Sequence, residues 1–129
     1  MLFRSTFTSG APFQRAMVTA LNLGDDYFTG LAADLWAKRD RVSAGLAAAG
    51  LDVYPAPGTY YLTADVRPLG YDDGMDFCRD LPGRCGVVAI PNRVFYDDQQ
   101  AGRSIVRFAY CKRIEVLDEA MDRLSGLAA

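Results

Sequence analysis

Arg107 is the residue of this 129-residue chain whose type and position point most directly to chemistry. It lies within Ser104–Tyr110, a run that otherwise is typical of a buried strand. A guanidinium is always charged, and burying a charge without a partner is costly. Arg107 therefore needs an anion, which is either a protein carboxylate or the carboxylate of a ligand. Asp65, on a neighbouring predicted strand, is the candidate protein partner.

The other reactive residue types restrict what the chain can catalyse. It has no histidine, so Ser-His-Asp and Cys-His mechanisms are excluded within it, and a zinc site would lack its usual ligands. Lysine occurs only at Lys38 and Lys112. The paired acids Asp72–Asp73 and Asp97–Asp98 lack further oxygen ligands at regular spacing. We expect these acids to be solvated and expect no metal site.

Composition and charge are those of an ordinary globular domain that works in a reducing compartment. The formal net charge is -2, which favours neither nucleic acid nor an anionic membrane as a partner. No apolar run approaches the roughly 18 residues of a membrane span, and the first residues lack the apolar stretch of a signal peptide. The 3 cysteines form no C-x-x-C pair. We therefore expect a cytoplasmic protein.

Hydrophobic periodicity and turn signals predict elements in the order α-α-β-β-α-β-β-α. Pro12 is expected in the first turn of the first helix, Gly50 after the end of the second, and Pro82–Gly83 as the break that ends the third. This order predicts an α+β fold over residues 1–129 as a single domain, with a small, mostly antiparallel sheet packed against helices. The expected helices are 12–21, 25–49, 72–81 and 115–127, and the expected strands are 51–54, 59–66, 87–90 and 104–111.

Some segments have both a structural and a functional interpretation. Gly58–Tyr61 is a turn before a strand, or a place where backbone approaches a ligand. Thr8–Gln14 is a capped helix start, or a set of free amides that meet an anion. The aromatic residues Tyr27, Phe28 and Trp36 are core or domain-interface residues.

Four segments occur together in an order that resembles a known family. They are Thr6–Gln14, Gly58–Tyr61, Gly86–Pro91 with Phe95–Tyr96, and Val106–Lys112. The family is the class I/II aminotransferases, which are pyridoxal-phosphate enzymes of fold type I, and the resemblance covers nearly the whole chain. Asp65–Asp73 is similar to one branch in particular, the actinobacterial N-succinyldiaminopimelate aminotransferases with their kynurenine and methionine aminotransferase relatives.

The resemblance implies that the chain is the C-terminal, small domain of an enzyme that transfers an amino group between an amino acid and a 2-oxo acid. It implies that Arg107 binds the substrate carboxylate and that residues 1–23 form an interface loop and helix. The Schiff-base lysine of the family lies upstream of anything that matches Met1, and neither Lys38 nor Lys112 matches it. We therefore expect no catalytic or cofactor-binding residue here, no firmly held pyridoxal phosphate, and no activity of the chain alone.

Two other functions remain open. The first alternative is a non-catalytic module that binds an amino acid or keto acid through Arg107. The second alternative is an interaction module that complements a separate N-terminal aminotransferase domain. We expect a homo-oligomer or a complex with such a domain. Without a ligand, Arg107 is expected to be solvated at an open edge or paired with Asp65.

Overall fold

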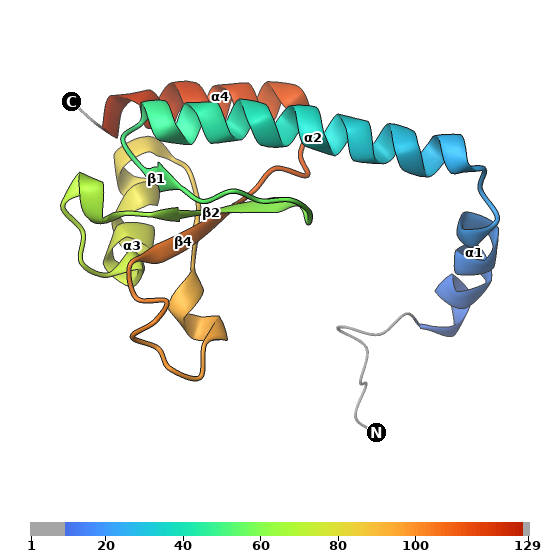
Figure 1. Cartoon of the computed structure of the whole chain (residues 1–129), viewed down its shortest axis with the longest axis horizontal. Helices are drawn as coiled ribbons and strands as arrows, with labels where there is room; N and C mark the ends of the chain where they lie inside the picture. The colour runs from blue at the N-terminus through green and yellow to red at the C-terminus, as the bar shows by residue number, and fades with distance from the viewer. Residues whose placement is uncertain (1–9, 128–129) are drawn as a thin grey trace. The chain divides into compact units, whose positions relative to one another are not determined.

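The structure is a computed structural model that describes residues 10–127, and it divides into two compact units, Met1–Ala33 and Asp34–Ala129. The element order is the predicted one, and the fold is α+β with a four-stranded antiparallel sheet (Figure 1). The helices are α1 (Ala11–Leu21), α2 (Asp25–Ala48), α3 (Gly74–Cys85) and α4 (Ile114–Leu124), and the strands are β1 (Asp52–Val53), β2 (Tyr61–Asp65), β3 (Ile90–Pro91) and β4 (Ile105–Ala109).

The first unit contains α1 and the beginning of α2. Gly10 precedes α1, and Pro12 lies in its first turn, as predicted. None of the described side chains in this unit is buried, so they form no core of their own. The large apolar side chains that are exposed here are Phe13, Met17, Val18, Leu21, Leu23, Tyr27, Phe28 and Leu31.

The second unit is built on the sheet, whose strand order is β1-β2-β4-β3. All pairings are antiparallel, and side chains along β2 and β4 alternate between two faces. Leu62 and Phe108 face the core and are buried, whereas Thr63 and Arg107 point to the opposite face and are half-buried. The same alternation places Asp65 on the face of Arg107.

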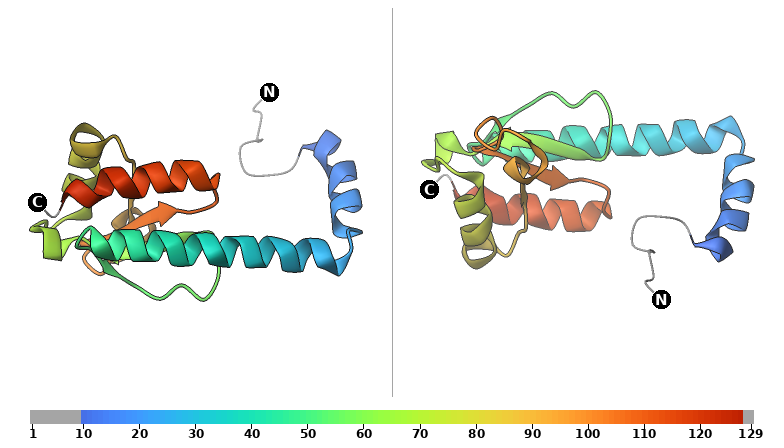
Figure 2. Two further views of the ribbon diagram at one scale, coloured as in Figure 1. Left: turned by 90° about the horizontal axis from the view of Figure 1, so that it is seen from above. Right: turned by 90° about the horizontal axis from the view of Figure 1, so that it is seen from below.

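The core lies between the buried face of the sheet and helices α2, α3 and α4. Figures 1 and 2 both show α4 beside the C-terminal half of α2. Gly45 permits this approach, because a Cβ at that position would overlap Met121 Sδ, and Arg41 pairs with Asp118 across the same helices. The buried helix residues of the core are Val42, Leu46, Ala49, Phe77, Leu81, Leu117 and Leu124.

The predicted buried strand over 87–90 is wrong. Only Ile90 and Pro91 pair with β4, and Val88 is 73% exposed. The physical reason is that β3 is at the edge of the sheet, so Val88 and Ile90 are covered on fewer sides than their composition predicts, although Ala89 between them is buried.

The expected end of the third helix is also wrong. α3 continues through Pro82 to Cys85 and ends at Gly86, whose φ of 71° is in the left-handed region. Pro82 lies inside α3, where its missing N–H removes one hydrogen bond to the carbonyl one turn earlier, but only three residues of the helix follow it. The second helix ends as predicted, with Gly50 at φ 90°. Within residues 10–127, no helix is long and apolar enough to cross a membrane.

Candidate functional site

Arg107 lies in the middle of β4, on the face of the sheet opposite the helical layer. Its strand neighbours are Thr63 on β2 and Ile90 on β3. Two aromatic rings contact its charge: Arg107 Cζ is 4.0 Å from the centroid of Phe95 and 5.0 Å from that of Tyr61. Both distances are within the range of cation–π attraction. The rings therefore fix the guanidinium without accepting its in-plane N–H groups.

No carboxylate in the described residues lies within ion-pair distance of Arg107, and its N–H groups donate to no described protein atom. Every buried side-chain nitrogen and oxygen of the described residues has a partner, so the N–H groups of Arg107 must face solvent. A planar fork of donors that faces solvent between aromatic walls is suited to bidentate binding of a carboxylate.

Of the two states expected for Arg107 without a ligand, pairing with Asp65 is not observed, because Asp65 pairs with Arg67. Arg67 Nη2 donates to Asp65 Oδ2 at 2.6 Å, and the backbone N–H of Arg67 donates to Oδ1 at 2.9 Å. Ser104 Oγ adds a bond at 3.1 Å. Burial raises the pKa of Asp65, but the hydrogen bonds from Arg67 and Ser104 outweigh burial and hold the pKa below its usual value.

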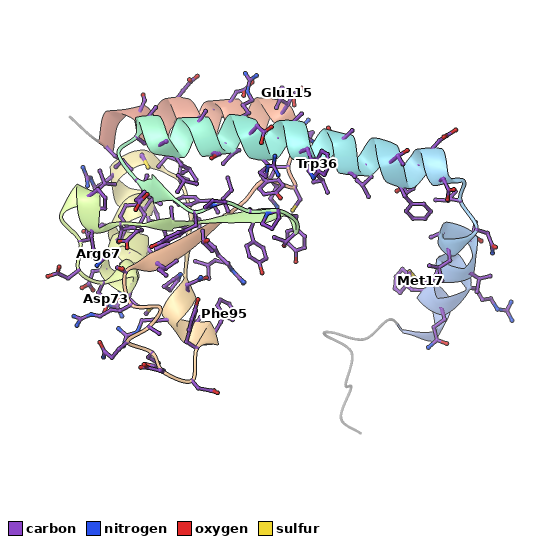
Figure 3. All side chains as sticks on the ribbon, in the orientation of Figure 1. Met17, Trp36, Arg67, Asp73, Phe95 and Glu115 are labelled. Atoms are coloured by element: carbon purple, nitrogen blue, oxygen red, sulfur yellow. The ribbon has the colours of Figure 1, made fainter. Side chains whose placement is uncertain are left out.

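Asp73, which we expected to be solvated, is largely buried and holds the segment that carries Phe95. It accepts a bond from the N–H of Met75 at 2.9 Å and so caps α3. Its Oδ2 also pairs with Arg93 at 2.5 Å. Arg93 belongs to the 3-10 helix η2 (Asn92–Phe95), so this ion pair ties η2 to α3. Figure 3 shows Asp73 and Phe95 on the side of the sheet away from α2 and α4.

The loop before Tyr61 contains a strained residue, but it is Thr59 and not the neighbouring glycine. Thr59 has φ 68°, which is unfavourable for a β-branched side chain. Buried Tyr110 supports this conformation, since its hydroxyl donates to Thr59 O at 2.8 Å. Gly58 has open space where a Cβ would stand, so no neighbouring described residue requires glycine there.

The remaining nucleophilic groups are not gathered at Arg107. Lys38 Nζ pairs with Asp34 at 2.6 Å on the surface of α2. Burial raises the pKa of the Cys78 thiol to about 11, so this thiol is protonated at neutral pH. No group of acids or cysteines within residues 10–127 is arranged to hold a metal ion.

Sequence reasoning located Arg107 but missed the residues that frame it. Tyr61 and Phe95 lie in segments that were singled out, yet nothing in their spacing showed that both rings meet one guanidinium. The pairing of Asp65 with Arg67 had a local signal, because an acid followed two residues later by a basic residue at a strand end can close on itself.

Comparison with known proteins identifies the family. Residues 1–124 match the family described as aminotransferase class I and II. The chain is 47% identical over 131 residues to a probable N-succinyldiaminopimelate aminotransferase DapC of Mycobacterium tuberculosis, with 95% of this chain and 33% of the relative covered. It is 33% identical over 141 residues to a kynurenine–oxoglutarate transaminase of Dictyostelium discoideum, with 94% and 32% covered.

Solved structures agree with the sequence relatives. The N-succinyldiaminopimelate aminotransferase of M. tuberculosis superposes with a TM-score of 0.85 at 48% identity, over 95% of this chain and 32% of that one. The Escherichia coli protein YbdL, whose structure identified a methionine aminotransferase function, gives 0.79 at 30% identity, over 94% and 32%. The chain thus spans about a third of the length of these relatives. It belongs to the class I and II aminotransferases, a family of pyridoxal-phosphate-dependent enzymes of fold type I.

Proposed function

We propose that this chain is the C-terminal, carboxylate-binding part of an aminotransferase, and that Arg107 binds the α-carboxylate of an amino acid or 2-oxo acid. The observation that carries the proposal is the guanidinium of Arg107, which is fixed between Phe95 and Tyr61 and pairs with no carboxylate of the described residues. A bidentate pair would set the orientation of a small substrate as well as its affinity.

The described residues do not fit the cofactor itself. Pyridoxal phosphate needs a lysine amine for its Schiff base. Lys38 is held by Asp34 on α2. Lys112 lies at a cavity of about 360 Å³ whose wall includes the apolar side chains of Val87 and Met121. Arg123 also lines this cavity, but it is paired with Glu119, so it is already neutralised by a protein carboxylate. We propose that the chain alone neither holds the cofactor firmly nor catalyses transamination.

Titration calorimetry and NMR test the carboxylate site directly. The full chain is titrated with 2-oxoglutarate, glutamate and kynurenine, and the same series is repeated with Arg107→Lys and Arg107→Ala. We expect weak binding that Arg107→Ala removes and Arg107→Lys reduces, because lysine keeps the charge but loses the fork. Binding that survives Arg107→Ala would place the ligand elsewhere and refute the proposal.

An assay with added pyridoxal phosphate separates the enzyme from its fragment. We expect no amino transfer between glutamate and a 2-oxo acid by the chain alone. An internal-aldimine absorption band in the isolated chain, or measurable turnover, would contradict the assignment. Binding of the acids without turnover also fits a second candidate function, a non-catalytic sensor of amino acids or keto acids. The site at Arg107 favours this candidate because the guanidinium and the ring of Phe95 both belong to the described residues of this chain.

We further propose that residues 1–23 form an interface with another subunit or with an N-terminal aminotransferase domain. Residues 1–9 lie outside the described part of the chain. In α1, the large apolar side chains of Phe13 and Leu21 are exposed, and contact of such side chains with water is unfavourable. Analytical ultracentrifugation should show an oligomer that the double variant Phe13→Ser/Leu21→Ser dissociates. The matched control is Val88→Ser, which changes an equally exposed apolar residue in the other unit. An oligomer that survives the double variant would refute this role.

The proposed compartment is the cytoplasm. Cys78, Cys85 and Cys111 are all free thiols in the structure, and free thiols are usual where the environment is reducing.

A further inference from the structure

Asp65 and Arg107 carry opposite charges on the same face of the sheet, and yet they are not paired. In the register of β2 and β4, Asp65 stands opposite Ile105 and Thr63 stands opposite Arg107, so the two charges are diagonal neighbours. Diagonal neighbours lie about 7–8 Å apart, which a long side chain can span. A carboxylate that is 2% exposed would be expected to take the nearest available cation.

The carboxylate of Asp65 is already saturated by other donors. Arg67 supplies three contacts from its side chain, at 3.0, 3.0 and 2.6 Å, and one from its backbone N–H at 2.9 Å. Ser104 Oγ lies at 3.1 Å and the Tyr54 hydroxyl at 3.4 Å. A carboxylate has about four lone-pair positions, so these donors leave none for Arg107.

Asp73, another acid on this side of the sheet, is occupied in the same way. It accepts a bond from the N–H of Met75, pairs with Arg93 at 2.5 Å and lies 3.5 Å from Arg103 Nε. Asp65 and Asp73 are therefore each paired with another arginine. Arg107 is left with aromatic contacts, which attract a cation but do not neutralise it.

We propose that Arg67 is a positioning residue for carboxylate binding at Arg107, because it occupies Asp65 and so keeps the guanidinium of Arg107 available to a ligand. The inference rests on the proposed function. Arg67 is suited to this task because its side chain is 67% exposed while that of Asp65 is 3% exposed. When Arg67 is removed, Asp65 stays buried with unfilled acceptors, and Arg107 is the cation that reaches it across the strand pair.

Modification by phenylglyoxal, which labels accessible guanidinium groups, tests this inference in the full chain. The initial labelling rate of Arg107 is measured by peptide mass spectrometry in the parent protein and in Arg67→Gln. We expect the rate to fall roughly fivefold to tenfold in Arg67→Gln, because a charge-assisted bond to a buried carboxylate engages the guanidinium. The matched control is Arg79→Gln, which removes an arginine of similar exposure from an exposed pair with Asp76.

Two more variants separate the effect from a general loosening of the fold. Asp65→Asn/Arg67→Gln removes the competing anion and should restore the labelling rate of Arg107 to that of the parent. Arg67→Lys keeps a cation beside Asp65 and should leave the rate nearly unchanged. Disturbed structure would make Arg107 more accessible and raise its rate. An unchanged or faster rate in Arg67→Gln, or a slow rate that the double variant does not restore, would overturn the proposal.

Ligand protection keeps this inference distinct from the proposed function. 2-Oxoglutarate at millimolar concentration should slow the labelling of Arg107 in the parent chain, and this protection should weaken in Arg67→Gln. If 2-oxoglutarate protects nothing while Arg67→Gln still slows labelling and the double variant restores it, the competition between arginines stands and the assignment of the ligand is at fault.

Discussion

The two units of the chain differ in burial although one helix runs through both. α2 carries apolar residues along its whole length, but Leu46 in the second unit is 0% exposed whereas Leu31 in the first unit is 47% exposed. The second unit has a sheet and two further helices to cover its residues, and the described residues of the first unit offer no such cover. The apolar pattern of a helix thus shows which face needs a partner, and the partner itself must come from elsewhere.

The largest expected effect comes from truncating one leucine in each unit. Leu46→Ala should lower the free energy of unfolding by about 2–5 kcal/mol, because it removes a fully buried side chain and leaves a cavity. Leu31→Ala should change it by less than about 0.5 kcal/mol, as is usual for a surface position. Urea unfolding followed by circular dichroism measures both. Equal losses would mean that the first unit is covered in solution.

Glycine-to-alanine changes in α2 should have opposite signs in the two units. Gly45→Ala should cost about 1–3 kcal/mol, because the added methyl group meets Met121. Gly30 has nothing within 4 Å of a Cβ, so Gly30→Ala should stabilise the helix by about 0.5–1 kcal/mol. Thermal unfolding of both variants checks the contrast. A destabilising Gly30→Ala would show that another surface packs on that turn.

Acid should weaken the second unit through Asp65. Its pKa is lowered on folding, so its contribution is full above the unfolded value of about 4 and is lost as the pH falls through the lower folded value. Asp65→Asn should therefore cost about 1–2 kcal/mol near neutral pH, and the difference should shrink on acidification. Unfolding curves at several pH values measure this. Asp26→Asn, an exposed site in the first unit, is the control; a difference that persists in strong acid would contradict the assignment.

The smallest expected effect is a gain at Thr59. Its left-handed backbone costs a β-branched residue about 1–2 kcal/mol. Glycine removes this strain, but the greater conformational freedom of the unfolded chain with glycine offsets part of the gain. Thr59→Gly should therefore stabilise the second unit by about 0.5 kcal/mol. Differential scanning calorimetry detects such a shift, and the exposed Gly58→Ala serves as a comparison. A loss of stability would show that the threonine side chain makes a contact that outweighs its strain.

Local signals were enough to predict most elements of the fold. Pro12 and Gly50 marked helix ends correctly, because the conformations they favour act within one turn. The prediction at Pro82 was wrong, because a proline removes one helical hydrogen bond without necessarily ending the helix, and α3 continues for three residues beyond it. The prediction at Val88 was wrong for a different reason, because composition cannot tell a central strand from an edge strand.

The candidate site was only partly predictable for a related reason. Arg107 was predictable because it is a charged residue in an apolar strand, and this can be recognised from the adjacent sequence alone. The two aromatic rings that contact Arg107 come from distant segments, at Tyr61 and Phe95. Their positions depend on the strand order and on the ion pair between Arg93 and Asp73. Competition among arginines for Asp65 depends on distances of a few ångströms, which spacing along the sequence does not encode.

The different environments of the three cysteines provide one natural attachment point for a reporter group. Cys78 is protonated because its pKa is about 11, and the half-buried thiol of Cys85 donates to Leu81 O, but Cys111 is exposed. A thiol-directed fluorophore or spin label would therefore attach at Cys111 without any engineered residue. Cys111 lies four positions beyond Arg107 along the chain, so the sequence itself offers a probe just past the strand that carries the proposed carboxylate site.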